Sequence, residues 1–89
     1  MRIFVLDGKD MTSKAEAYRV IGATMEFPDW FGANLDALAD CLGELPKETT
    51  IVFVNTAILE ENVGDYAGKI LETFRDLSEE CGFGLIEKR

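Results

Sequence analysis

Two aspartates four residues apart, Asp36 and Asp40, are the side chains of this chain best placed to do chemistry. Leucines recur at helical spacing around them, which predicts a helix that carries both carboxylates on one face. The edge away from the leucines holds Asp36, Ala39, Asp40 and Gly43. The two like charges repel by roughly a few tenths of a kcal/mol, and Asp40 also opposes the helix dipole. Because neither placement helps folding, we interpret the edge as a binding site, with an ordinary solvated helix face as the alternative.

Catalysis by these carboxylates is the competing hypothesis. Paired carboxylates can act as acid and base in a glycosidase, or hold a metal for phosphoryl transfer. A domain this small offers little room for a sugar cleft, and no metal-ligand set is visible beyond the two aspartates. Cys41 lacks a histidine to activate it, and no glycine-rich phosphate loop precedes a helix. We therefore expect no enzyme, no cofactor and no metal, and keep a small hydrolase as an alternative.

A second acidic stripe is expected on a long helix near the C-terminus. One face of that segment is apolar, and the other carries Glu72, Asp76, Glu79 and Glu80. The simpler interpretation is again an ordinary solvent-exposed helix face. Two such stripes on neighbouring helices would, however, form one anionic surface. Just before the first acidic helix, Trp30 precedes Gly32 in a short loop, where it could serve as an exposed aromatic anchor, whereas Phe31 is expected to fold onto the core.

Net charge narrows the range of partners. The chain has 17 acidic and 9 basic residues, a net charge of −8, and no lysine or arginine between Arg19 and Lys47. Direct binding of nucleic acid depends on attraction to phosphates, so this composition argues against it. A region of one sign attracts partners of the opposite sign, although solubility is the simpler explanation of the overall charge.

Apolar periodicity predicts one α/β domain spanning residues 1–89. The expected order is strand, two helices, strand, helix, strand, with a three-stranded parallel sheet packed with helices. The first strand is expected to be buried, the second to be central and covered on both faces, and Pro28 to end the first helix. Strands are expected at 2–6, 49–54 and 83–86, with a loop or short helical turn at 56–64. Thr12 or Ser13 can cap the first helix, Asn34 is the expected N-cap of the second, which Gly43 stops, and a long helix is expected at about 65–81.

Cellular context follows from what is missing. The N-terminal apolar run ends at Leu6, too short for a signal peptide, and no segment approaches a membrane span, so a cytoplasmic location is expected. Without an export signal, Cys41 and Cys81 are expected to be reduced and buried, with a disulfide as the minor alternative.

The segment from Phe27 to Leu42 closely resembles the signature of the barstar family of ribonuclease inhibitors. It shares the family's proline, acid, two aromatics, glycine, asparagine and Leu-Asp-Ala-Leu, followed by aspartate and leucine. The resemblance extends over the whole chain, strongly in the middle and weakly from 44 to 64. It implies a three-stranded parallel sheet packed with helices. It also implies an inhibitor of a basic, extracellular-type guanyl ribonuclease, which blocks the active site with an acidic helix and the preceding loop.

By this resemblance Asp40 would take the place of a substrate phosphate, Asp36 would add a polar contact, Asp76 would contribute at the rim, and Trp30 would pack on the catalytic histidine. Family members can carry a large aromatic where this chain has Ala39, and a hydroxyl residue where it has Gly43. These departures leave the target open. The predicted partner-binding residues are Trp30, Gly32, Asn34, Asp36, Ala39, Asp40, Gly43, Asp76 and Glu80.

We therefore expect an antitoxin-like protein that is monomeric when free. Its net charge argues against direct binding of nucleic acid, and the lack of a long apolar segment argues against a membrane span. The alternative is an acidic interaction domain for another basic partner. An acyl carrier is a further form of that alternative, but Ser13 and Ser78 lack the Asp-Ser-Leu setting that such a carrier would need.

Overall fold

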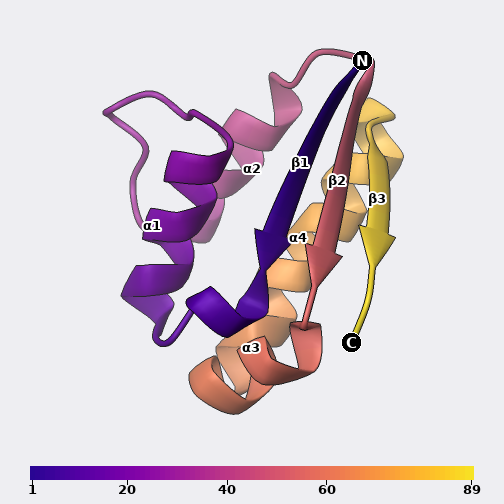
Figure 1. Cartoon of the computed structure of the whole chain (residues 1–89). Helices are drawn as coiled ribbons and strands as arrows, with labels where there is room; N and C mark the ends of the chain where they lie inside the picture. The colour runs from indigo at the N-terminus through magenta and orange to yellow at the C-terminus, as the bar shows by residue number, and fades with distance from the viewer.

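The computed structural model describes all 89 residues as one α/β unit (Figure 1). The predicted fold class is confirmed. The elements in chain order are strand β1 (Arg2–Asp7), the 3-10 helix η1 (Gly8–Asp10), helices α1 (Lys14–Thr24) and α2 (Leu35–Gly43), strand β2 (Thr49–Val54), helices α3 (Thr56–Val63) and α4 (Asp65–Cys81), and strand β3 (Gly84–Glu87).

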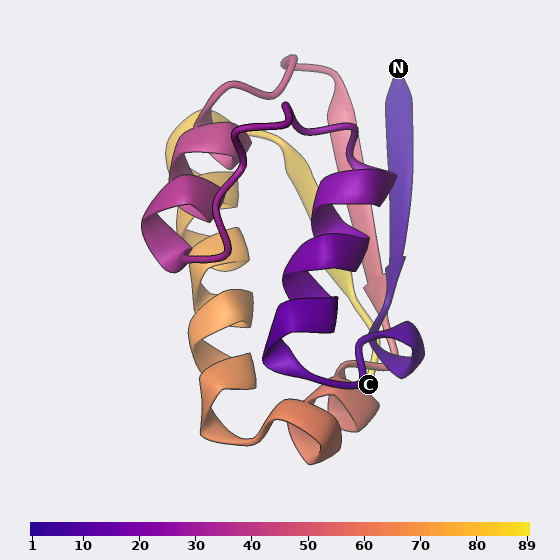
Figure 2. The same cartoon turned by 90° about the vertical axis from the view of Figure 1, so that its left-hand side faces the viewer.

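The sheet is parallel, with β2 in the centre and the order β1-β2-β3. Helices α1, α2 and α4 lie on one side of it, as the edge-on view of Figure 2 shows, while η1 and α3 lie at the carboxyl end of the strands. The prediction of a buried first strand is therefore wrong, because Ile3 and Val5 are 61% and 56% exposed. The prediction that β2 is covered on both faces is also wrong. An unbroken apolar run is typical of a doubly covered strand, but here alternate residues face helices and solvent.

The core lies between the sheet and the helix layer. The inward side chains of β1 and β2, among them Leu6, Ile51 and Phe53, pack against α1, α2 and α4. Phe53 and Phe74 meet edge to face with ring centroids 5.3 Å apart, which joins β2 to α4. This contact sets the position of α4, the helix that carries the second acidic stripe.

Helix ends follow local hydrogen bonding. The Ser13 hydroxyl caps α1 by accepting a hydrogen bond from the Glu16 N–H at 3.1 Å, one of the two caps that the sequence offered. The helix ends at Thr24, earlier than the predicted stop at Pro28, because Glu26 has the left-handed φ of 57° that turns the chain away. The 56–64 segment, expected as a loop or short turn, is the two-turn helix α3.

Two further expectations concern the surface. Both cysteines are free, as predicted, and Cys41 is buried, but Cys81 is exposed because α4 ends there. None of the helices combines the length and the apolar character that crossing a lipid bilayer requires.

Candidate functional site

Helix α2 presents the two aspartates to solvent. Its leucines enter the core, with Leu38 and Leu42 fully buried, and this leaves Asp36 and Asp40 exposed on the opposite side. The Asn34 side chain starts the helix by accepting a hydrogen bond from the Ala37 N–H at 2.8 Å. Asn34 thus has a structural role in addition to the predicted binding role, since its cap fixes where the aspartates begin.

Helix α4 runs beside α2, so the two acidic stripes are neighbours, with α2 along the C-terminal half of α4 (Figure 2). Gly43, at the end of α2, lies against Leu77: a Cβ at residue 43 would be only 3.8 Å from Leu77 Cδ1. Asp76 and Glu80 are i, i+4 neighbours on α4, the helix whose Leu77 contacts the end of α2. Glu72 and Glu79 are also exposed on α4.

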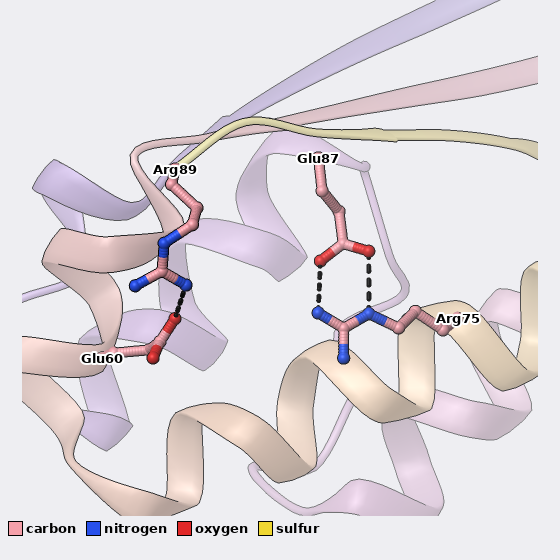
Figure 3. A network of polar contacts seen from close by, with 4 residues as sticks. All are labelled: Glu60, Arg75, Glu87 and Arg89. Carbon is pink, nitrogen blue, oxygen red and sulfur yellow. Dashed lines mark hydrogen bonds and ion pairs between the residues drawn. The ribbon is translucent and has the colours of Figure 1, made fainter.

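Each member of this group of carboxylates, Asp36, Asp40, Asp76 and Glu80, is exposed and has no basic partner in the chain. We call it the acidic face. All four arginines are occupied elsewhere by glutamates. Arg75 makes two hydrogen bonds to Glu87, at 2.8 and 2.7 Å, and Arg89 makes one to Glu60 at 2.8 Å (Figure 3). No lysine is within ion-pair distance of a carboxylate. The negative potential of the acidic face is therefore not neutralised internally.

The loop before α2 is held by aromatic packing. Phe31 packs on Phe27 and Tyr18, with ring centroids 5.0 and 6.1 Å apart, as expected for a residue that folds onto the core. Gly22 makes this packing possible, because a Cβ there would meet the Phe31 ring at 3.0 Å. The adjacent Trp30 is 63% exposed. Sequence reasoning missed the role of Gly22, although a glycine inside a helix costs about 1 kcal/mol and so signals a packing requirement.

Gly32 connects this loop to α2. A Cβ at residue 32 would lie 3.0 Å from the Asn34 Nδ2, so a side chain there would push against the residue that caps the helix. Ala39 is half-buried and Gly43 is exposed. Because alanine and glycine project little from a helix, no bulky side chain stands beside the two aspartates at the middle and end of α2.

Tyr18 links α1 to α4. The sequence did not indicate that this residue helps to position the loop before α2. Its hydroxyl lies 2.5 Å from that of Tyr66, and the Lys14 ammonium sits 4.2 Å from the centre of the Tyr66 ring. Burial, and next the hydrogen bond with Tyr66, raise the pKa of Tyr18 well above its ordinary value. The same tyrosine ring supports Phe31, so this contact helps to fix the loop that carries Trp30.

An alkaline loss of stability is expected from this tyrosine. In the unfolded chain Tyr18 ionises near its ordinary pKa of about 10, whereas the folded chain keeps the proton to higher pH. Above about pH 10 the unfolded state binds fewer protons, so the free energy of unfolding falls as the pH rises. Urea denaturation from about pH 8 to about pH 11 should show this slope. The Tyr18→Phe variant should be less stable by about 0.5–1.5 kcal/mol at the lower pH and show a flatter slope; an unchanged slope would contradict the assignment.

The acidic face does not border a cavity. The larger depression, about 490 Å³, lies between α1 and the following loop, and its lining includes Arg19 and Asp29 but neither Asp36 nor Asp40. No cysteine, aspartate and glutamate side chains cluster as a metal site would require. Burial, with Glu44 and Asp40 nearby, raises the pKa of the Cys41 thiol, which keeps it protonated and a poor nucleophile. The acidic face is thus open to solvent and separate from the larger depression.

Comparison with known proteins identifies relatives of the whole chain. Residues 1–87 match the family model described as Barstar (barnase inhibitor). A Bacillus subtilis (strain 168) protein, named "Putative ribonuclease inhibitor YrdF", is 35% identical over 81 residues, which cover 90% of this chain and 89% of that protein. The match extends over β1, the helix layer and β3, and so includes every element that positions the acidic face.

Proposed function

Because this chain belongs to the barstar family, we propose that it inhibits a basic, guanyl-type ribonuclease by covering the enzyme's active site with α2 and the loop before it. The acidic face occupies the cleft in which the enzyme binds the RNA backbone. Asp40 takes the place of a phosphate group, Asp36 binds beside it, and Asp76 and Glu80 contact basic side chains at the rim.

The observation that carries this proposal is the pairing pattern of the carboxylates. Where an arginine is available in this fold, it is already bound to a glutamate outside the acidic face. The four carboxylates of the face are left with water as their only partner. Arginine and histidine donors of a ribonuclease would form charge-assisted hydrogen bonds with them, which are about twice as strong as neutral ones. Like an RNA backbone, the acidic face is negatively charged and accepts hydrogen bonds from basic side chains.

The apolar part of the interface is smaller than the family resemblance alone implies. Trp30 provides one exposed aromatic anchor, but Ala39 and Gly43 provide no bulk. The matching enzyme surface therefore has to approach α2 closely with its own side chains. We propose that these two positions select the target, through the size of the enzyme residues that fit over them.

Such an inhibitor acts where the ribonuclease is made. We propose that it binds the enzyme in the cytoplasm before export and so protects the cell's own RNA, in the manner of an antitoxin. One inhibitor molecule then has to capture each newly made enzyme molecule rapidly. A chain with a net charge of −8 favours this, because long-range attraction accelerates encounter with a basic protein.

Binding should be tight and sensitive to salt. Immobilised protein should capture a basic ribonuclease from host lysate and culture medium at low ionic strength, and the purified pair should lose RNA cleavage at a 1:1 ratio. Raising the salt from about 0.05 to about 0.5 M should slow association by at least tenfold, since the Debye length falls from roughly 14 to roughly 4 Å. Capture of a basic protein without any loss of RNA cleavage would instead support the alternative, an interaction domain. No complex at low salt with any basic ribonuclease of the host would contradict the proposal.

A further inference from the structure

The side of the sheet away from the helices is an apolar surface that the proposed inhibition does not use. We call it the open face; it is turned toward the viewer in Figure 1. Five large hydrophobic residues of this chain are exposed, and three of them, Ile3, Val5 and Ile86, lie on the open face, at 61%, 56% and 48% exposure. A fourth, Met1, immediately precedes β1. Surfaces of this kind on monomeric proteins are often contact sites.

Strand register arranges the open face in three rows. Ile3, Thr50 and Gly84 form the first row, and Val5, Val52 and Ile86 form the second. The third row contains Asp7 on β1 and Val54 on β2, and Lys88 continues it beyond β3, where its N–H donates to the Phe53 carbonyl at 2.8 Å. The face is thus apolar in the middle and carries Asp7 and Lys88 at one end, on opposite edges, while at its other end the Met1 ammonium lies 3.8 Å from the Glu48 carboxylate.

Asp7 is held in place at its edge. Its Oδ1 accepts hydrogen bonds from the Lys9 N–H at 2.9 Å and from the Asn55 Nδ2 at 2.8 Å, which leaves Oδ2 free. These bonds, the one from Asn55 first, lower the pKa of Asp7, so the carboxylate is ionised at neutral pH. Lys88, at the other edge, is exposed and has no acidic partner in the chain.

From this pattern we propose that the open face binds a second copy of this chain, with the two-fold axis parallel to β2. That axis places β1 of one copy over β3 of the other. Ile3 then lies over the partner copy's glycine in the first row, Val5 over its isoleucine in the second, and Asp7 opposite its lysine in the third. Each of these contacts occurs twice in the dimer, as two-fold symmetry requires.

The positions of Asp7 and Lys88 favour this axis over one that runs across the strands. If the two-fold axis ran across the strands instead, the third row of one copy would lie over the first row of the other. Asp7 and Lys88 would then be covered by apolar or small residues without an opposite charge, and burying an unpaired charge is costly. The axis parallel to β2 gives an apolar centre together with two Asp7–Lys88 pairs of unlike charges.

The size of the open face sets the strength of the association. Three strands about 4.8 Å apart and about six residues long, at roughly 3.3 Å each, form a patch of roughly 15 by 20 Å. That is well below the area of a stable dimer, so the contact is weak and reversible. The expectation of a free monomer then holds at low concentration and fails at high concentration. Because the helices lie on the other side of the sheet, both acidic faces of the dimer stay accessible (Figure 2).

Sedimentation equilibrium of the purified chain tests this inference without any ribonuclease. At about 0.15 M salt, which screens the repulsion between two acidic molecules, the average mass should rise with concentration from 9.9 kDa toward twice that value. Lys88→Glu, which places two carboxylates opposite each other, should weaken dimerisation by about tenfold. Lys69→Glu is the matched control, because it makes the same charge change on α4, away from the sheet, and should leave dimerisation unchanged.

A variant in the apolar centre provides the second measurement. Val5→Lys should abolish the dimer, and if it fails to fold, the isosteric Val5→Thr should still weaken dimerisation severalfold at an unchanged melting temperature. A mass that stays at 9.9 kDa at every concentration would overturn the inference. So would a dimer that neither the Val5 nor the Lys88 substitution weakens, because its contact would then lie elsewhere.

Discussion

Asp40→Ala is expected to weaken binding of the ribonuclease by roughly two to four orders of magnitude while leaving the melting temperature nearly unchanged. Removing one member of a desolvated charge pair leaves the other buried without a partner, which costs about 3–5 kcal/mol. In the free protein Asp40 is exposed, has no ion-pair partner and lies late in α2, so its removal costs the fold nothing. Isothermal titration or surface plasmon resonance gives the affinity, and thermal denaturation gives the stability.

The control for this experiment is Glu61→Ala. Glu61 is an exposed glutamate on α3 with no basic partner, and it lies outside the acidic face. Its removal changes the net charge by the same amount, so it measures the loss of long-range attraction alone. Glu87 also lies outside the acidic face, but it is unsuitable as a control because its carboxylate is bound to Arg75. Equal losses of affinity from Asp40→Ala and Glu61→Ala would mean that binding depends on overall charge and not on a localised site.

Phe74→Ala should lower the free energy of unfolding by about 3–5 kcal/mol. The Phe74 ring is fully buried and meets Phe53 edge to face, so truncation leaves a cavity between α4 and the sheet. At about 0.05–0.15 kcal/mol per residue, a chain of 89 residues has only about 4–13 kcal/mol in total. Urea denaturation should show a large decrease of the midpoint, and the variant should be partly unfolded if the total is near the lower figure.

Trp30→Ala is the matched control for that loss, because it removes an aromatic ring from an exposed position. It should change the free energy of unfolding by less than about 0.5 kcal/mol, yet weaken ribonuclease binding by at least 2 kcal/mol if Trp30 is an interface anchor. If the two variants were equally destabilised, the assignment of Phe74 to the core and of Trp30 to the surface would be wrong. Together they separate residues that maintain the fold from residues that contact the partner.

Helix positions were predictable because they depend on local spacing. The leucines around Asp36 and the apolar residues of 65–81 identify α2 and α4 without any knowledge of their neighbours, and Asn34 caps α2 as expected. The end of α1 was less predictable. Pro28 is a visible stop signal, but the chain turns earlier, at the left-handed Glu26, and nothing in the local residue types requires that conformation.

The strands show where local pattern is insufficient. Apolar runs such as 51–54 are read as buried on both sides, yet whether a second layer covers a strand depends on where the helices pack. Here every connection returns on the same side of the sheet, and the open face results (Figure 2). The three rows of that face likewise exist only through the register of β1, β2 and β3, which joins residues more than 30 positions apart in the sequence.

The sequence by itself determined the excess of negative charge, the helices that carry it and the spacing that places Asp36 and Asp40 on one face, because these depend on composition and on contacts within a few residues. Only the tertiary structure decided which carboxylates remain unpaired. Arg2, Arg75 and Arg89 reach glutamates 24, 12 and 29 positions away, and no local rule predicts those partners. Packing of α2 against α4 also makes the two helices with acidic stripes neighbours, because an ion pair and a shared surface both depend on distance in space rather than along the chain.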